Sequence, residues 1–204
     1  MYDPIWDSIF SSRAWGRYPA EELIRFVMRE SSRFRDKALE LGCGPGANLC
    51  FLANEGIRFD AIDGSSSAVA QAKMRLDSES PGWKGRIEVG NFCVMPSDFN
   101  EYDFVLDSEA IYCNDFEESK NLISDIFEKL VPGGAFWSRT FAPGTWGVES
   151  GKLIGRDYWI ANEGPMVNKG QTRLTRLESL PELYGAGWDT INVGELIIVA
   201  RKPN

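Results

Sequence analysis

The stretch KALELGCGPG, residues 37–46, decides how the rest of the chain is interpreted. A short apolar segment, typical of a buried β-strand, runs directly into Gly42, Gly44 and Gly46. Glycine has no Cβ, so it permits a tight turn and lets a ligand approach the backbone closely. A plain strand-to-helix turn would not need three glycines on alternate positions. The stretch therefore predicts a ligand-binding loop.

Two kinds of ligand fit this loop. The spacing Gly42-x-Gly44-x-x-Ala47 satisfies the fingerprint of a dinucleotide-binding loop. However, Pro45 lacks the N–H that a pyrophosphate needs at the start of a helix, and Glu40 would repel a diphosphate. A carboxylate at residue 40 instead suits a ligand that carries an ammonium group. An NAD-linked oxidoreductase is therefore the disfavoured alternative.

A second acidic residue, Asp63, ends the next predicted strand, 23 residues after Glu40. An acid at this place accepts hydrogen bonds from ribose hydroxyls, although it could instead cap the helix that follows. Taken with Glu40, it describes a ligand with both a ribose and a cationic end.

Strand and helix patterns alternate along the chain. Helices are expected at 19–29, from 47 to a stop at Gly56, and at 66–77, 116–130 and 176–186. Strands are expected at 37–41, 58–63, 86–89, 102–106, 135–140, 191–193 and 196–200. The pattern predicts an α/β fold, a three-layer, doubly wound and mostly parallel seven-stranded sheet with helices on both faces. Such sheets bind ligands at the carboxyl ends of their strands.

The length of 204 residues favours one domain, residues 1–204. Residues 1–30 form an N-terminal cap in which 1–18 are irregular and rich in aromatic residues. Residues 141–172 hold six glycines and no convincing period, so we expect a long loop that acts as a substrate lid.

Composition excludes several function classes. The chain contains no histidine, so a catalytic base must be Asp, Glu, Tyr, Lys or Cys, and no metal site is expected. The net charge of −8 disfavours nucleic acid and anionic membranes as partners. The four cysteines form no Cys-x-x-Cys pair, and no signal peptide or membrane span is recognisable. We expect a cytoplasmic protein with reduced cysteines, a monomer or a homodimer.

Five segments in order resemble the motifs of the class I S-adenosylmethionine-dependent methyltransferases. They are ALELGCGPG (38–46), FDAIDGSSSAVAQAK (59–73), GNF (90–92), YDFVLDSEAIY (102–112) and LVPGGAFW (130–137). The resemblance implies the Rossmann-like methyltransferase fold, with S-adenosylmethionine as cofactor and S-adenosylhomocysteine as product. It also implies a cofactor site made of Glu40, Gly42, Gly44, Gly46, Asp63, Gly64, Asn91, Phe92 and Asp107. Within it, the glycines line the methionine part, Asp63 holds the ribose, and Asn91 and Phe92 meet the adenine.

The candidates for shaping the reaction centre follow the strand at 102–106. Asp107, Glu109 and Tyr112 stand at the carboxyl end of that strand, where chemistry belongs in this architecture. The alternatives are that Asp107 caps a helix and that the other two are solvated or packing side chains. Either a carboxylate acts as a base, or alignment of the reactants alone supplies the rate, which we favour.

Substrate contacts are expected from aromatic and basic residues near the predicted pocket: Tyr18, Arg139, Trp146 and Trp159. Tyr2, Trp6, Trp15 and Tyr18 either fold over the cofactor or form a hydrophobic plug. The segment WGRYPAEELIRF (15–26) is similar to a group of small bacterial methyltransferases of surface-polysaccharide or secondary-metabolite pathways. The predicted activity is methyl transfer to an O, N or C nucleophile of a small molecule. The alternatives are another S-adenosylmethionine enzyme or a non-catalytic binding module.

Overall fold

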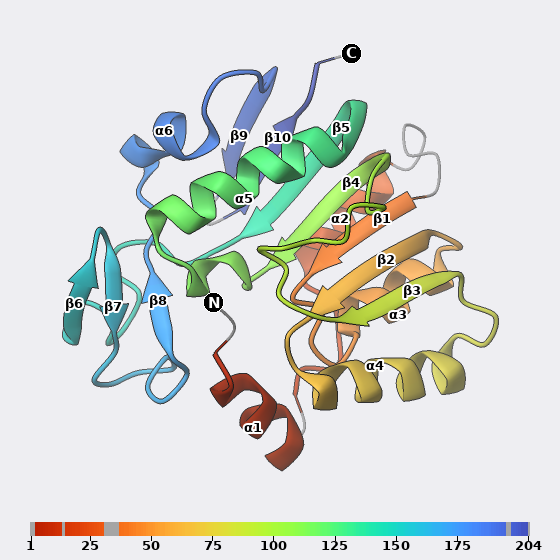
Figure 1. Cartoon of the computed structure of the whole chain (residues 1–204), viewed down its shortest axis with the longest axis horizontal. Coiled ribbons are helices and arrows are strands. Elements are labelled where there is room, and N and C mark those ends of the chain that lie inside the picture. Colours follow the sequence, from red (N-terminus) through yellow and green to blue (C-terminus); the bar gives the residue numbers. More distant parts are fainter. Residues whose placement is uncertain (1–2, 14, 31–36, 195–196, 204) are drawn as a thin grey trace.

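The computed structural model describes residues 3–13, 15–30, 37–194 and 197–203. Its centre is a seven-stranded sheet in the order β3–β2–β1–β4–β5–β10–β9, shown in Figure 1. The strands are β1 (Lys37–Leu41), β2 (Arg58–Asp63), β3 (Gly85–Val89), β4 (Tyr102–Ser108), β5 (Leu130–Arg139), β9 (Thr190–Gly194) and β10 (Ile197–Arg201). The predicted fold class is confirmed. Leu196, which the expected last strand included, lies outside the described residues, as does Tyr2.

The strand order reverses at β1, which pairs in parallel with β2 on one side and β4 on the other. β4 also pairs in parallel with β5, whereas β10 is antiparallel to both β5 and β9. The carboxyl ends of β1, β2 and β4 therefore meet at one edge of the sheet, which is where ligands bind in doubly wound folds.

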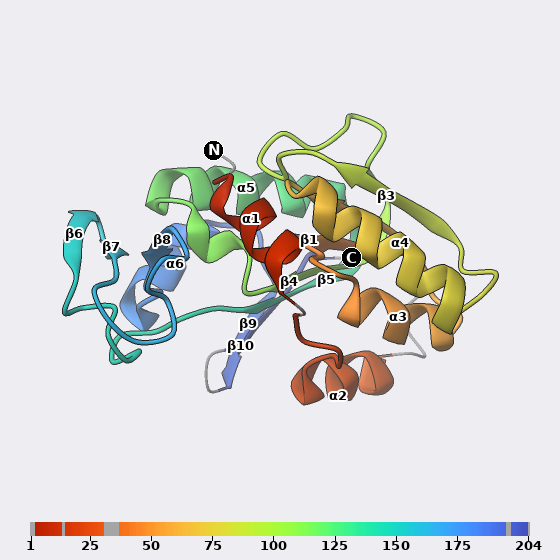
Figure 2. The same ribbon diagram turned by 90° about the horizontal axis from the view of Figure 1, so that it is seen from below.

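Helices cover both faces of the sheet. The helices are α1 (Ile5–Ser12), α2 (Glu21–Glu30), α3 (Ala47–Asn54), α4 (Ser66–Glu79), α5 (Phe116–Lys129) and the short α6 (Leu180–Tyr184). Figure 2 shows α5 on one side of the sheet and α2 and α3 on the other. Neighbouring residues of β1 explain this: Ala38 packs with α2, α3 and α4, while Leu39 packs with α5 and α6. Among the described residues, no helix has both the length and the apolar character to cross a membrane.

Three parts of the chain differ from expectation. Residues 5–12 form α1, although this segment was expected to be irregular; its aromatic side chains obscured a helix of only two turns. β5 begins at Leu130, before Pro132 and the two glycines that follow it, because its pairing with β4 shifts there. The expected helix 176–186 is shorter, a 3-10 turn (Leu177–Ser179) followed by α6.

The segment 141–172 is not a plain loop. It contains β6 (Lys152–Gly155) and β7 (Tyr158–Ile160), which with β8 (Gln171–Arg173) form a second, three-stranded antiparallel sheet. Its strands have only three or four residues, and β6 is exposed throughout, so no alternating pattern marks them in the sequence. The Tyr158 hydroxyl donates to the carbonyl oxygen of Cys113 at 2.6 Å, which attaches this sheet to the turn after β4.

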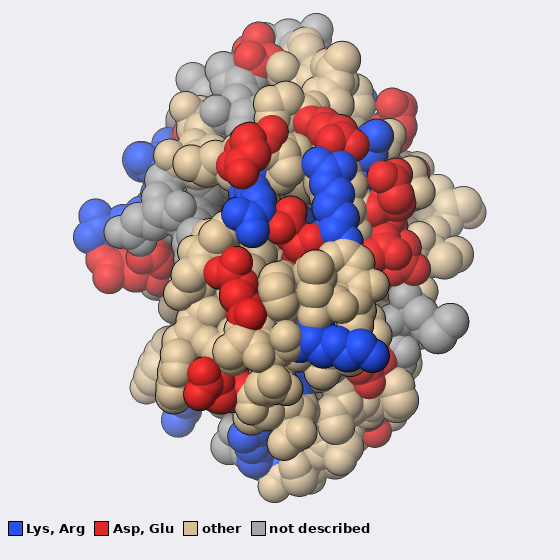
Figure 3. Space-filling view, turned by 90° about the vertical axis from the view of Figure 1, so that its left-hand side faces the viewer, with Lys and Arg blue, Asp and Glu red and all other residues tan. Residues whose placement is uncertain are grey.

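Charges of both signs alternate on the face that carries the small sheet, as Figure 3 shows. Arg156 makes two hydrogen bonds to Glu182, at 2.8 and 2.9 Å, and Arg176 pairs with Asp157 at 2.6 Å. The described part of this face therefore presents no broad surface of a single sign.

Helix α1 lies beside the edge at which β1, β2 and β4 end (Figure 1). Asp7 fixes it there, because one carboxylate oxygen accepts from the Ser65 hydroxyl at 2.6 Å and from the Ser67 N–H at 3.0 Å. The Gln71 amide donates to the Phe10 carbonyl oxygen at 2.7 Å. The bonds from Ser65 and Ser67 lower the pKa of Asp7, and all three bonds join α1 to the beginning of α4.

We expect Asp7→Ala to release α1 while leaving the central sheet intact. Trypsin should then cleave after Arg13 or Arg17 several-fold faster than in the unchanged protein, because local opening exposes the chain. Asp125→Ala removes an exposed carboxylate from α5 and is the matched control. Equal cleavage rates in all three proteins would show that Asp7 does not hold the helix.

Candidate functional site

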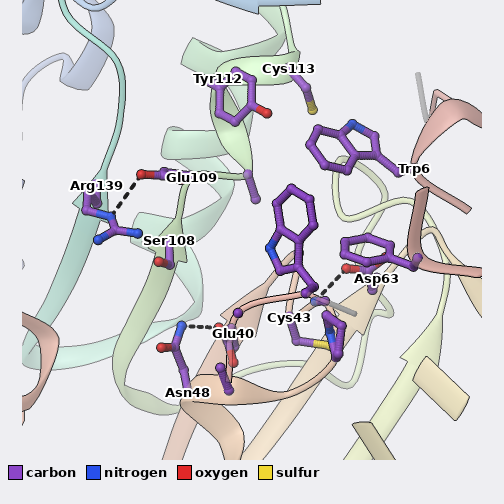
Figure 4. Close-up of a pocket in the computed structure, with 18 of the residues that line it drawn as sticks. Trp6, Glu40, Cys43, Asn48, Asp63, Ser108, Glu109, Tyr112, Cys113 and Arg139 are labelled. Carbon is purple, nitrogen blue, oxygen red and sulfur yellow. Dashed lines mark hydrogen bonds and ion pairs between the residues drawn. The ribbon is translucent and has the colours of Figure 1, made fainter. Parts of the chain in front are cut away.

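A cavity of about 360 Å³ opens at the carboxyl edge of the sheet. Four loops line it, those after β1, β2, β3 and β4, together with the N-terminal segment and residues from 139 to 169. Figure 4 shows Glu40, Asn48 and Asp63 toward one end of this cavity and Tyr112, Cys113, Glu109 and Arg139 toward the other.

The glycine loop follows β1 in a conformation that requires glycine. Gly42 and Gly44 have φ values of +65° and +51°, in the left-handed region, and both line the cavity. A Cβ at residue 42 would lie 2.4 Å from the Cβ of Ala110, so no side chain fits there. Gly46 does not line the cavity, contrary to expectation. It precedes α3 with φ +81°, and a Cβ there would lie 3.0 Å from that of Ala72.

Glu40, the residue before the last of β1, has 1% of its surface exposed and lines the cavity. Its Oε1 accepts from the Asn48 amide at 2.6 Å, while its buried Oε2 has no hydrogen-bond partner. Burial raises the pKa of this carboxyl to about 8, although the Asn48 bond opposes the shift. A buried oxygen without a donor is costly, so the site is suited to a cationic N–H from a ligand.

Asp63 also lines the cavity, and it has a second role that the sequence left open. One of its oxygens accepts from the Gly44 N–H and the other from the Ser65 N–H, both at 2.8 Å. Its carboxylate therefore ties the glycine loop to the loop after β2. Each oxygen retains a lone pair, so ribose binding stays a prediction for Asp63. Gly64, next in the chain, lines the cavity too.

The two residues expected at the adenine are placed differently. Phe92 lines the cavity, whereas Asn91 does not. The side-chain oxygen of Asn91, Oδ1, accepts from the Cys93 N–H at 3.0 Å in a local turn. A contact of Asn91 with adenine stays a prediction.

Asp107 is not positioned as a base or as a cofactor contact. It is buried, does not line the cavity, and accepts three hydrogen bonds, from the N–H groups of Ala110 and Ile111 at 2.8 and 3.0 Å and from the Ser138 hydroxyl at 2.6 Å. Burial raises its pKa, which the three hydrogen bonds oppose. Asp107 instead shapes the turn after β4.

Glu109 and Tyr112 do line the cavity, as does Arg139. Glu109 has φ +59°, which is unusual for a residue with a side chain and is typical of functional turns. Its Oε1 lies 3.2 Å from Arg139 Nε, yet that N–H makes no aligned hydrogen bond. Burial raises the pKa of Tyr112 well above its ordinary value, so this residue stays a neutral phenol.

The three aromatic residues expected to meet substrate are not all at the cavity. Tyr18 lines it, as do Trp6 and Trp15 from the same N-terminal segment. Trp146 is 70% exposed, and Trp159 packs against the core of the small sheet; neither lines the cavity. In the segment 141–172 the lining side chains are those beside the strands: Phe141, Pro165, Met166 and Lys169.

Sequence reasoning missed Lys169 and Cys113 as lining residues. Neither residue belongs to one of the five motifs. Residue 169 is also far from the glycine loop in the sequence, so no local pattern indicates that both line one cavity. Burial raises the pKa of the Cys113 thiol to about 12, so it remains protonated and cannot serve as a base near neutrality.

Alanine variants of Asp107 and Glu109 should differ in the free energy of unfolding, because only Asp107 has a structural role in the turn after β4. Asp107→Ala leaves three donors without their acceptor, so the free energy of unfolding should fall by about 2–5 kcal/mol. Glu109→Ala should cost less than about 1 kcal/mol, since it removes an exposed ion pair. Urea denaturation of both variants measures this, and equal losses would contradict the structural role of Asp107.

A family model described as a methyltransferase domain matches residues 38–134. No match was found among curated proteins. Solved structures share the fold at low sequence identity. The CcbJ methyltransferase from Streptomyces caelestis superposes with a TM-score of 0.73 at 15% identity, covering 100% of both chains.

Two further structures agree. An S-adenosylmethionine-dependent methyltransferase from Methanosarcina mazei gives a TM-score of 0.71 at 19% identity over 91% of this chain and 99% of that one. The magnesium protoporphyrin IX methyltransferase from Synechocystis, solved with S-adenosylhomocysteine bound, gives 0.65 at 16% over 89% and 80%. These findings show a methyltransferase domain over residues 38–134 and the Rossmann-like fold that S-adenosylmethionine-dependent methyltransferases share.

Proposed function

We propose that this methyltransferase modifies a small-molecule acceptor in a biosynthetic pathway, at an oxygen, nitrogen or carbon nucleophile. The observation that carries the proposal is one continuous cavity with two chemically different ends (Figure 4). Its volume of about 360 Å³ lies in the range of small-ligand sites. Helix α1 and the segment 165–169 contribute to its lining, which leaves little room for a macromolecular acceptor.

The first end fits S-adenosylmethionine. Glu40 offers an unpartnered carboxylate oxygen to an ammonium group, and Gly42 and Gly44 present bare backbone to the ligand. Asp63 lies where ribose hydroxyls are accepted, and the Phe92 ring offers a flat surface to a base. When bound, S-adenosylmethionine supplies an electrophilic methyl group on a sulfonium.

The second end would hold the acceptor. Tyr112 and Phe141 meet edge to face with ring centroids 4.7 Å apart and form an apolar wall. Met166 and Pro165 bring the segment 141–172 to the same cavity, so we retain this segment as the substrate lid. The lid acts through the residues beside its strands rather than through Trp146 and Trp159.

Alignment of the reactants would supply most of the rate. Asp107 is held by three donors, and Tyr112 and Cys113 stay protonated, so these three groups do not act as bases. Glu109 faces Arg139, which holds it as an ion pair. The chain's own contribution is then to orient the acceptor, exclude water and hold Glu40 against the positive end of the cofactor.

Transfer of labelled methyl groups tests the proposed function. The protein is incubated with S-adenosylmethionine labelled in the methyl group and with cell extract separated by mass. We expect label in the low-mass fraction, and none there when Gly42→Val, which closes the glycine loop, replaces the unchanged protein. Label confined to protein or nucleic acid would contradict a small-molecule acceptor, and tight cofactor binding without any transfer would indicate a binding module.

The raised pKa of Glu40 predicts a pH-dependent affinity. The folded protein favours the protonated carboxyl, so the stability that this group contributes without ligand is present below the unfolded pKa and is lost as pH rises toward 8. A cationic ligand needs the ionised form. Affinity for S-adenosylhomocysteine should therefore rise by up to about tenfold per pH unit and level off near pH 8.

Glu40→Gln should remove this pH dependence and weaken binding at pH 8, as measured by calorimetry. Glu55→Gln, an exposed position just after α3, is the matched control and should behave as the unchanged protein. A Glu40→Gln variant that keeps both the affinity and the pH profile would show that Glu40 does not contact the ligand.

A further inference from the structure

Two cations share one aromatic ring that lines the cavity, that of Trp15. The Lys169 ammonium lies 5.1 Å from the ring centroid of Trp15, and the Arg13 guanidinium carbon lies 5.2 Å from the same ring. Trp15 and Lys169 both line the cavity. The ring attracts each cation but cannot neutralise either, because it carries no net charge.

Within the described residues, no carboxylate forms an ion pair with Lys169 or Arg13. Glu109 is the acid that acts on Lys169 electrostatically, and it is already paired with Arg139 at 3.2 Å. Arg13 opposes the charge on Lys169. Partial burial, which costs the ammonium part of its hydration, together with Arg13 lowers the pKa of Lys169.

The balance of charge around Lys169 and Arg139 is therefore positive. Lys169 and Arg139 line the cavity, and Glu109, which pairs with Arg139, is the carboxylate that also acts on Lys169. Arg13 is exposed and does not line the cavity. Arg139 also keeps its Nε–H without an aligned acceptor, although this atom is buried. An anion that enters the cavity would balance the excess positive charge and would accept a hydrogen bond from the Arg139 Nε–H.

The other side chains that line the cavity indicate which kind of molecule carries the anionic group. The cavity that Lys169 lines also has apolar side chains in its wall: the Tyr112–Phe141 pair, Met166 and Trp15. An inorganic ion would leave these surfaces uncovered, whereas an organic anion with an apolar body would bury them.

We propose that Lys169 binds an anionic oxygen of the acceptor, so that the acceptor is a small carboxylate or phenolate on an apolar, ring-sized body. This inference rests on the proposed function, since it concerns the acceptor of the same reaction. An acceptor that arrives with a negative oxygen is already nucleophilic, which suits a site without histidine and without a free base. Lys169 is a specificity residue at the substrate.

The test uses aromatic probes of one shape and three charges. Protein saturated with S-adenosylhomocysteine is titrated with 2-naphthoate, 2-naphthamide and 2-naphthylmethylammonium, and binding is followed by the quenching of tryptophan fluorescence. A nitro-substituted 2-naphthol, which ionises near neutrality where Lys169 is still charged, is titrated above and below its own ionisation as the phenolate arm. We expect one of the anions to bind at least about tenfold more tightly than the neutral and cationic probes.

Lys169→Gln should lower the affinity for that anion about tenfold, and Lys169→Arg should keep most of it. Both variants should bind S-adenosylhomocysteine as the unchanged protein does. Lys152→Gln, an exposed lysine on β6 away from the cavity lining, is the matched control and should change nothing. Preference for naphthoate identifies a carboxylate site, and preference for naphtholate a phenolate site; either supports the proposal.

Equal binding of charged and neutral probes would overturn the proposal, as would an anion preference that survives Lys169→Gln. No binding of either anion up to roughly 10 mM would overturn it as well, since even a contact of a few kcal/mol would saturate by then. In these three cases S-adenosylhomocysteine still binds and the proposed function stands. Failure of S-adenosylhomocysteine to bind is a separate result, which contradicts the proposed function itself.

Discussion

The close packing of Gly42 against Ala110 is the constraint on which the site depends. A Cβ at residue 42 would lie 2.4 Å from that of Ala110, so the loops after β1 and β4 touch only because residue 42 has no side chain. The Gly42 N–H also donates to the Ile62 carbonyl oxygen at 2.8 Å, which extends the pairing of β1 and β2 into the loop. Asp63 then binds the next turn of the glycine loop. Three loops meet at one edge, and the cofactor end of the cavity adjoins the acceptor end.

Acidic and basic side chains lie on different parts of the cavity lining, so the cavity can orient two ligands of opposite charge. The carboxylates of Glu40 and Asp63 lie at the end of the cavity that we propose for the cofactor, where a cationic ligand belongs. Arg139 and Lys169 line the same cavity, and Arg139 lies toward the end that we propose for the acceptor (Figure 4). The carboxylates would bind the positively charged cofactor, and the basic side chains would bind a negatively charged acceptor. The two reactants would then face each other along the line of methyl transfer. Positioning of this kind lowers the barrier without a titrating base.

The sequence predicted the sheet well because its strands are long, buried and bounded by glycine or acidic residues. β1 was expected at 37–41 and is found there, and β2 likewise at 58–63. The three-stranded sheet was not predicted, since exposed strands of three or four residues carry no period. Asp107 was misinterpreted for another reason: its place at the end of β4 suits catalysis, but only the structure shows three donors converging on it.

Lys169 could not be predicted from local pattern, because it reaches the cavity through a segment with no regular structure between β7 and β8. The roles of Glu40, Gly42, Gly44 and Phe92 stay predictions, although all four line the cavity. Gly46 and Asn91 show the limit of a motif match: both stand in the expected motifs, yet one packs against α4 and the other makes a turn.

Calorimetric titration with S-adenosylhomocysteine and with NAD tests most directly whether Glu40 and the glycine loop form an S-adenosylmethionine site. S-adenosylhomocysteine should bind one site per chain, and NAD should give no heat. Binding of NAD without any response to S-adenosylhomocysteine would contradict the assignment of the site.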